Sequence, residues 1–329
     1  MVPQLLQLNA AGTPLSGGPL NLRDAFFTTT PITTNGIDPI VRGLLAQQAQ
    51  EIDSHVVDEL RNFLFGPPGS GGQDLVSLNI QRGRDRGLPS YTQARLDFGL
   101  SPITSFSQIT SDVAAQQMLQ SVYGTVDKID VWAGGIAEDH AAGALVGPLF
   151  QKIIADQFTR TRNADRFWYE NSRFTATELT AIRTTTFADL IARNTGLTNL
   201  PTNVFTTNTP PIGPAPAGNA AATAPTDFRS SDGSGNNQTN PTLGQTGTNL
   251  KTNFTVSYGD GISTPGGADR PGAREISNAV FPQTGSIPNQ QGATALAVFF
   301  GQILSHDLSL TATGITDTIK IHGDQAIPA

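Results

Sequence analysis

The feature that most constrains this chain is a charged stretch that directly follows an apolar one, within residues 75–100. Leu75 and Val76 begin an apolar run that we expect to continue into a hydrophobic core. Arg82 and Arg84 follow within the same stretch. A buried guanidinium group without a partner is costly because arginine does not give up its proton. The two arginines therefore predict acidic partners or an anionic ligand.

The spacing alone leaves two interpretations of these arginines open. One is a structural salt-bridge network with Asp85 and another acid elsewhere in the chain. The other is a clamp that holds an anionic ligand.

The segment NIQRGRDRGLPSY, residues 79–91, resembles the asparagine-arginine signature of the animal-type haem peroxidases, the peroxidase-cyclooxygenase superfamily. The resemblance implies that Asn79 accepts the proton on the second ring nitrogen of the proximal histidine and so orients the iron ligand. It also implies that Arg82 pairs with a haem propionate, for which a planar guanidinium group is suited. Arg86 departs from the family, which usually has histidine there.

Composition limits the classes of partner. The chain has 329 residues, is 37% hydrophobic, and carries a net charge of −7. This charge argues against nucleic acid or an anionic membrane surface as the main partner. The absence of cysteine excludes disulfides, thiol catalysis and thiolate metal sites. No stretch approaches the roughly 18 apolar residues of a membrane helix, and no signal peptide is visible in this chain.

The hydrophobic periodicity predicts a mainly α fold with long loops and little β structure, and the resemblance implies a haem-peroxidase-like helical core. We expect helices from Asp38 and over 52–64, a helix capped by Ser111, a tight buried turn at Trp132 to Gly135, and a helix opened by a Thr175–Glu178 capping box.

Residues 127–171 also resemble the same family, in the AEDH turn and the DRFWYEN segment. The resemblance makes His140 a loop residue and not an iron ligand. His55 is expected on the surface or in the core of the 52–64 helix, because no second ligand lies near it in sequence. We interpret four polar residues as structural pairs rather than catalytic groups: Asp165, Arg166, Glu170 and Asn171.

The segment GQILSHDLSLT, residues 301–311, resembles the distal-helix motif of these peroxidases. By this resemblance His306 exchanges a proton with hydrogen peroxide, Gln302 lines the distal cavity, and Asp307 is a calcium ligand. The pattern alone also fits a buried His306 bonded to a backbone carbonyl. Ser305 stands where many members have an aspartate esterified to the haem, so a covalent link on that side is excluded.

The expected domain organisation follows from the order of these motifs. Residues 201–225 hold six prolines and no charged residue, which predicts an extended linker. In the family the distal motif precedes the asparagine-arginine signature, whereas here it follows. We therefore expect residues 1–200 to be the C-terminal half of one peroxidase domain and residues 226–329 to be the N-terminal half of the next. A chain cut from a tandem protein explains this order more simply than a circular permutation.

The resemblance implies a bacterial haem peroxidase that binds haem b and calcium, reduces hydrogen peroxide and oxidises a halide or small organic donor. The parent protein is expected to be extracellular, with neighbouring peroxidase domains as possible partners. Because no proximal histidine or distal arginine is identified, we expect little activity from this chain alone; His55, His140 and His322 have no motif support as iron ligands. Two alternatives stay open: a fatty-acid dioxygenase of the same superfamily, and a non-catalytic structural module of a large secreted protein.

Overall fold

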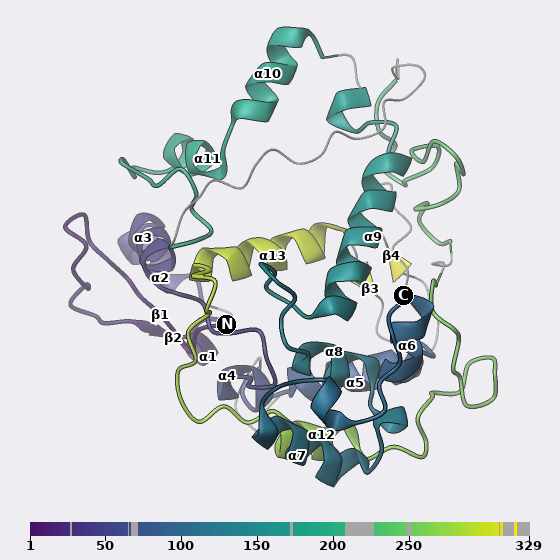
Figure 1. Ribbon diagram of the computed structural model, residues 1–329. Coiled ribbons are helices and arrows are strands. Elements are labelled where there is room, and N and C mark those ends of the chain that lie inside the picture. The colour runs from purple at the N-terminus through teal and green to yellow at the C-terminus, as the bar shows by residue number, and fades with distance from the viewer. Residues whose placement is uncertain are drawn as a thin grey trace. The chain divides into compact units, whose positions relative to one another are not determined.

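The computed structural model describes residues 1–26, 28–64, 66, 72–171, 174–207, 227–248, 252–308, 310–311 and 319–320, with side chains as far as residue 304 (Figure 1). The described chain divides into two compact units. Unit 1 comprises Met1–Lys152, Ile191–Thr209 and Phe254–Val298, and unit 2 comprises Ile153–Leu190, Pro210–Asn253 and Phe299–Ala329. Unit 1 therefore contains residues from both sides of the expected linker.

The described residues are mainly helical, which confirms the predicted fold class. The elements in unit 1 are β1 Gln4–Leu5, β2 Leu20–Asn21, α1 Leu22–Ala25, α2 Thr30–Asn35, α3 Asp38–Ala46, α4 Asp58–Arg61, α5 Leu75–Asp85, α6 Tyr91–Asp97, η1 Phe106–Gln108, α7 Val113–Tyr123, η2 Val126–Lys128, α8 Val131–Ala137 and α12 Ala273–Val280.

The remaining elements lie in unit 2 or have residues in both units. They are α9 Pro148–Ala164, η3 Tyr169–Asn171, α10 Ala176–Thr184, α11 Phe187–Asn194, α13 Ala295–Leu308, β3 Leu310–Thr311 and β4 Ile319–Lys320. The β1–β2 and β3–β4 pairs are antiparallel. No helix in the described ranges is long and apolar enough to cross a membrane.

Helix α5 has clear local signals at both ends. At its start, the Asp74 side chain accepts hydrogen bonds from the backbone N–H groups of Val76 and Ser77, at 3.0 and 3.2 Å. At its end, Gly87 adopts a positive φ of 64°, a conformation that glycine takes without steric cost. Val76 and Ile80 are each 1% exposed, so the apolar run that begins at Leu75 does continue into the core.

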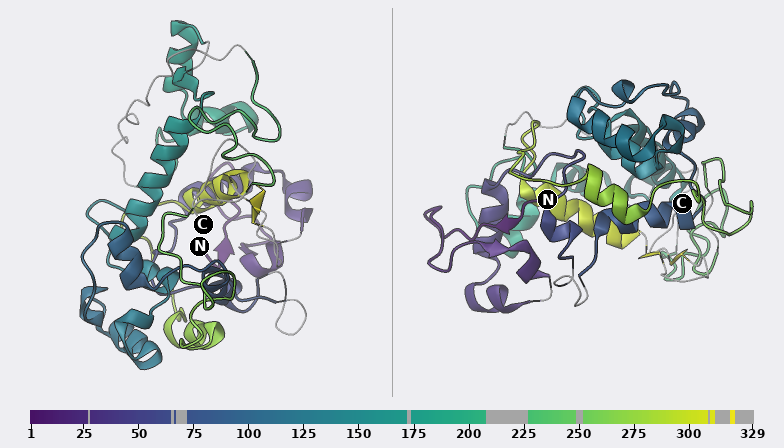
Figure 2. Two further views of the ribbon diagram at one scale, coloured as in Figure 1. Left: turned by 90° about the vertical axis from the view of Figure 1, so that its right-hand side faces the viewer. Right: turned by 90° about the horizontal axis from the view of Figure 1, so that it is seen from below.

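Helix α12 provides the other side of this core. It packs on α5 and α7, and Figures 1 and 2 show the yellow-green α12 beside these blue helices. Ile276 and Val280 are fully buried there, and Phe281 packs against Trp132 of α8 with a ring-centroid distance of 5.3 Å and an angle of 40° between the rings. Residues far apart in sequence thus share one hydrophobic core in unit 1.

Helix α8 replaces the tight turn that we predicted at Trp132 to Gly135. A β-carbon at Gly134 would overlap the ring of Tyr91, and one at Gly135 would overlap the ring of Phe150. The glycines therefore allow close packing of a helix rather than a turn. Tyr91 is fully buried, and its hydroxyl donates to Glu138 Oε1 at 2.6 Å.

The predicted helix over 52–64 is wrong in most of its length. Gln48, Gln50 and Val56 form isolated bridges with Thr294, Pro288 and Pro282, and residues 52–54 form a bend. These long-range bonds use the backbone groups that a helix would need. Helix α4 covers only Asp58–Arg61, and His55 lies outside it.

Other local predictions agree more closely with the structure. Helix α3 begins at Asp38 with a proline in its first turn, and α10 begins with the predicted Thr175–Glu178 capping box. Helix α7 is capped by Asp112 and not by Ser111. In the expected linker, the described residues 201–207 belong to unit 1, where the Thr207 N–H donates to the Gly292 carbonyl at 2.7 Å. The rest of the linker lies outside the described residues, so the predicted domain organisation stays a prediction.

Unit 2 contains the ion pairs that were interpreted as structural. Arg166 makes a two-pronged contact with Asp227 at 2.9 and 2.6 Å. Asp165 pairs with Arg229 at 2.9 Å, and Glu170 pairs with Arg183 at 2.8 Å. The Asn171 side chain donates to the Asp165 carbonyl at 3.0 Å. These contacts confirm the interpretation as structural pairs.

Gly134→Ala is expected to lower the free energy of unfolding by about 1–3 kcal/mol, because the added methyl group must displace the buried Tyr91 ring. Gly285→Ala is the matched control, since its methyl group meets no atom within 4 Å. Urea unfolding of both variants measures the difference. Equal stabilities would contradict the close packing of α8 on α6.

Asp74→Asn tests the cap of α5 through pH. Burial by itself raises the pKa of Asp74, but hydrogen bonds from Ser277, Ser77 and Arg274 outweigh it and lower the pKa below its ordinary value. The stabilisation is therefore present above about pH 4, the ordinary range of an aspartate, and lost as pH falls through the lowered pKa. We expect the variant to be less stable than wild type at pH 7 and the difference to shrink in acid, as measured by thermal unfolding. A difference that grows in acid would contradict this assignment.

Candidate functional site

Helix α5 carries both site residues of the asparagine-arginine signature. Asn79 and Arg82 are three positions apart, so their side chains leave the helix on the same face. Asn79 is half-buried and Arg82 is exposed. The opposite face carries Ile80 and Arg84, which are buried.

The two arginines have different surroundings. Arg84 donates two hydrogen bonds to the carboxylate of Asp130, from Nε at 2.9 Å and from Nη2 at 2.7 Å. Burial disfavours the charged form of Arg84, but the hydrogen bond and charge of Asp130 outweigh it and raise its pKa. Arg82 forms no ion pair with any acid in the described ranges. Arg84 is therefore structural, whereas the guanidinium group of Arg82 remains open to a ligand carboxylate.

Asn79 borders a small cavity of about 10 Å³ together with Gly83 and Trp132. Such a volume holds at most one water molecule. No hydrogen bond within the described residues engages the Asn79 amide, so its oxygen is free to accept a hydrogen bond from an incoming group.

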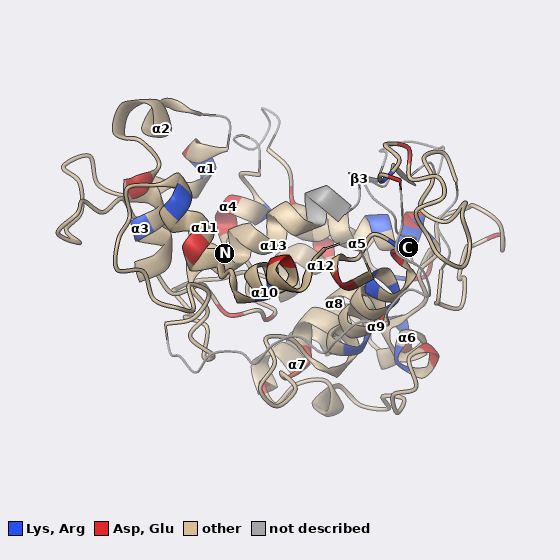
Figure 3. Ribbon diagram, turned by 90° about the horizontal axis from the view of Figure 1, so that it is seen from above, with Lys and Arg blue, Asp and Glu red and all other residues tan. Residues whose placement is uncertain are grey.

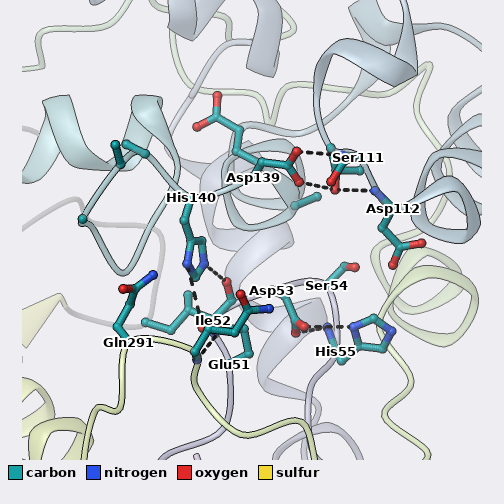
Figure 4. A pocket seen from close by; sticks show the side chains of 17 residues that line it. Glu51, Ile52, Asp53, Ser54, His55, Ser111, Asp112, Asp139, His140 and Gln291 are labelled. Carbon is teal, nitrogen blue, oxygen red and sulfur yellow. Dashed lines mark hydrogen bonds and ion pairs between the residues drawn. The ribbon is translucent and has the colours of Figure 1, made fainter. Parts of the chain in front are cut away.

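The two histidines with described side chains lie elsewhere, at a cavity of about 470 Å³ in unit 1. His140 contacts the Ile52 carbonyl through Nε2 at 2.7 Å. His55 Nδ1 lies 3.2 Å from Asp53 Oδ2. Figure 4 shows both rings among the residues of this cavity. Because neither imidazole lies on the Asn79 face of α5, the interpretation of His140 as a loop residue fits this position.

The same cavity is lined by carboxylates from three segments, Glu51 and Asp53, Asp112, and Glu138 and Asp139. Burial by itself raises the pKa of Asp139, but hydrogen bonds from Ser111 and Thr110 outweigh it and lower the pKa. Figure 4 shows the bonds of Asp139 toward Ser111. The Asp139 carboxyl group on the cavity wall therefore stays ionised at neutral pH.

The distal-helix residues lie on α13. Gln302 is exposed. His306 and Asp307 fall within the helix, but their side chains lie outside the described part of the chain, so both assignments stay predictions. Among the residues that the structure describes, no group of three or more His, Asp or Glu is placed to hold a metal ion.

The family model described as animal haem peroxidase matches residues 1–205 and 228–326. This chain belongs to the animal haem peroxidase family. The chain is 45% identical to peroxinectin A of Dictyostelium discoideum over 177 residues, which is 54% of this chain and 33% of that protein. It is 40% identical to human eosinophil peroxidase over 210 residues, 62% of this chain and 29% of that protein.

Solved structures agree with this membership. Peroxidase A from Dictyostelium discoideum matches with a TM-score of 0.57 and 42% identity, covering 62% of this chain and 40% of that chain. The fatty acid alpha-dioxygenase of Oryza sativa matches with a TM-score of 0.50 at 22% identity, covering 59% of this chain and 34% of that chain, and shows a shared fold alone. This family member thus spans about a third of the length of the curated relatives.

The described residues include groups that suit a haem propionate and the imidazole that ligates the iron. Arg82 offers an exposed cation without a described acidic partner, which suits a propionate, and Asn79 offers a free amide oxygen on the same helix face. The 10 Å³ cavity beside Asn79 is too small for the ring itself. Figure 3 shows acidic and basic positions together on α3 and on α6. On α3, Arg42 lies 3.7 Å from Asp38.

Sequence reasoning missed the partners that order this region. Arg84 was predicted to need an acid, and that acid is Asp130, not Asp85, which accepts from Gln81 at 2.8 Å. Arg270 also binds Asp130, at 2.8 Å, and not its sequence neighbour Asp269. The one available signal was that a buried cation needs a buried anion, which names the type of partner and not its position.

Arg84→Gln and Arg82→Gln form a matched pair on one helix. We expect Arg84→Gln to lower the free energy of unfolding by about 3–5 kcal/mol, because it breaks a buried ion pair. Arg82→Gln should change it by less than about 0.5 kcal/mol, because Arg82 is exposed and has no described acidic partner. Urea unfolding measures both. A large loss in Arg82→Gln would mean that Arg82 is also a structural residue.

Proposed function

We propose that this chain is part of a haem-dependent peroxidase that reduces hydrogen peroxide and oxidises a halide or a small organic donor. Membership of the animal haem peroxidase family supports the reaction class, and relatives named peroxinectin A, eosinophil peroxidase and thyroid peroxidase support it further. The observation that carries the proposal for this chain is the open Asn79–Arg82 face of α5, beside an Arg84 that is already paired.

Each residue has a distinct role in this proposal. Haem b, when bound, supplies the iron at which peroxide chemistry takes place. Arg82 holds a propionate through charge-assisted hydrogen bonds. The Asn79 amide oxygen accepts the N–H of the imidazole that ligates the iron, and so fixes its tautomer and orientation.

The distal roles fall on α13. His306 takes a proton from hydrogen peroxide and returns it to the departing oxygen, which suits an imidazole near neutral pH. Gln302 lines the distal cavity, and Asp307 contributes a carboxylate to a calcium ion. We propose further that the parent protein is extracellular and contains neighbouring peroxidase domains. Because neither described histidine lies on the Asn79 face, turnover by this chain alone should be weak.

A haemin titration followed by visible absorption tests the proposal. The wild-type chain is expected to give a Soret band that saturates at one haem per chain, because Arg82 holds the haem, while turnover stays weak. Arg82→Gln should weaken haemin binding about tenfold, because it removes one charge-assisted contact while the fold is kept. Arg23→Gln, at an exposed arginine of unit 1, is the control and should bind as wild type does.

Peroxide separates the distal role from haem binding. His306→Ala should keep the Soret band and lose the spectral change that peroxide produces. Equal haemin affinities of Arg82→Gln and Arg23→Gln would contradict the role of Arg82. The absence of a saturating band would mean that haem binding requires the longer protein.

A further inference from the structure

Unit 1 is built from both segments that the family model matches, residues 1–205 and 228–326. The second of these segments supplies Phe254–Val298. We propose that residues 254–298, the docking segment, bind in cis to the surface of residues 1–152. In a protein with tandem peroxidase domains, one core therefore contains residues from two successive repeats.

The docking segment supplies one side of the hydrophobic core of unit 1. Helix α12 packs on α5 and α7 (Figure 1). Ile276 and Phe281 are 0% exposed, and so is Leu119 of α7, while Ile80 of α5 is 1% exposed. The burial of apolar surface is the dominant favourable contribution to folding. Separation of α12 from α5 and α7 would expose such surface on all three helices.

Backbone hydrogen bonds join the docking segment to residues 47–56. Three N–H groups donate to the carbonyls of Ala293, Ile287 and Phe281, at 2.7, 2.7 and 3.0 Å, and they belong to Ala49, Glu51 and Val56. In the opposite direction, the Ala295 N–H donates to the Gln47 carbonyl at 2.7 Å. Because buried backbone groups need partners, these bonds make the docking segment part of the fold of unit 1. Ala295 is the first residue of α13, so α13 begins in this core.

Charged groups of the docking segment face opposite charges on the rest of unit 1. Arg270 lies 2.8 Å from Asp130, and both side chains are buried. Arg274 lies 2.5 Å from Asp74, the residue that caps the start of α5. Complementary charges of this kind fix the register between two surfaces and disfavour other pairings.

The docking segment also caps the end of α5. The Gly266 N–H donates to the Arg84 carbonyl at 2.9 Å, and the Ser257 N–H donates to the Gly87 carbonyl at 2.8 Å. Such bonds are needed because the last carbonyl groups of a helix have too few intrahelical partners. As far as the proposed function holds, docking thereby orients the Asn79–Arg82 face of α5 toward its ligand.

Both ends of the docking segment are bonded to the first matched segment. Near its start, the Thr255 N–H donates to Asp97 Oδ2 at 2.7 Å. Near its end, Thr294 Oγ1 donates to the Val204 carbonyl at 2.8 Å. The alternative is an exchange in which the docking segment of one copy completes the core of another. A segment tethered in the same chain has a high effective concentration, which favours docking in cis.

Amide hydrogen exchange of the unmodified chain tests the docking. It is measured at two protein concentrations about a hundredfold apart, because docking between copies would follow mass action. The reporters are the amides of Ala49, Glu51 and Val56, whose acceptors lie in the docking segment. We expect these amides to be protected equally at both concentrations. The Leu179 amide, which donates to the Thr175 carbonyl at 2.9 Å within one helix, is the control for dilution.

Two results of the exchange measurement would overturn the proposal. Protection of the reporters that falls on dilution would mean that the docking segment comes from another copy. Exchange of the reporters as fast as in an unstructured peptide would mean that the segment does not dock at all.

An engineered disulfide tests the same contact in a chain that has no cysteine of its own. Gln50 and Pro288 are partners in an antiparallel bridge. The hydrogen bonds on either side of this bridge make them a pair without direct backbone bonds, whose Cα atoms lie about 4.5 Å apart, within the range of a disulfide. Oxidation of Gln50→Cys with Pro288→Cys is expected to give a cross-linked monomer that migrates faster on a non-reducing gel.

Ala11→Cys with Pro288→Cys is the matched control, because Ala11 lies in an exposed turn and is not a bridge partner of Pro288. This pair should give no cross-linked monomer. A disulfide-linked dimer in place of the cross-linked monomer of Gln50→Cys with Pro288→Cys would overturn docking in cis. Neither test involves haem, so failure of haemin binding in a chain whose docking is confirmed would contradict the proposed function alone.

Discussion

The carboxylate of Asp130 is the group on which the rest of unit 1 depends. It is 3% exposed and receives hydrogen bonds from Arg84, from Arg270 at 2.8 Å and from the Tyr123 hydroxyl at 2.9 Å. These donors belong to α5, to the segment before α12, and to α7. Burial, followed by the charge of Asp130, raises the pKa of Tyr123 well above its ordinary value, so its hydroxyl stays a donor. One buried anion thus holds together elements from distant parts of the chain.

This network divides α5 into a structural face and an open face. Arg84 is used fully by Asp130 and by the Pro271 carbonyl at 2.9 Å. The Asn79 and Arg82 side chains leave the helix on another face and keep their hydrogen-bonding groups for a partner. A helix held rigidly by one face is a suitable platform for orienting ligands on another. Each of the two interpretations that the sequence left open therefore applies to one arginine. Arg84 belongs to a structural salt-bridge network, and Arg82 is available to an anionic ligand.

Local structure was predictable where its causes are local. The Thr175–Glu178 capping box and the start of α3 at Asp38 depend on residues within one turn, and both were found. The prediction failed where distant residues compete for the same backbone groups. Residues 52–64 have apolar spacing compatible with a helix, but the Val56 N–H donates to the Phe281 carbonyl and only Asp58–Arg61 are helical. The turn predicted at Gly134 was wrong for a similar reason. The absence of a side chain at Gly134 leaves space for the Tyr91 ring, and the residue is helical.

The sequence by itself determined the family, because a motif is a local property. The three-residue spacing of Asn79 and Arg82 became a shared helix face only when the structure showed that Leu75–Asp85 is helical. Only the tertiary structure decided which arginine is consumed by the fold, since Asp130 lies 46 residues from Arg84 and 140 from Arg270. The acidic cavity was equally hidden, because its walls come from segments around residues 51–55, 110–112, 137–143 and 290–291. Residues separated along the chain line one cavity only when packing brings them to one place.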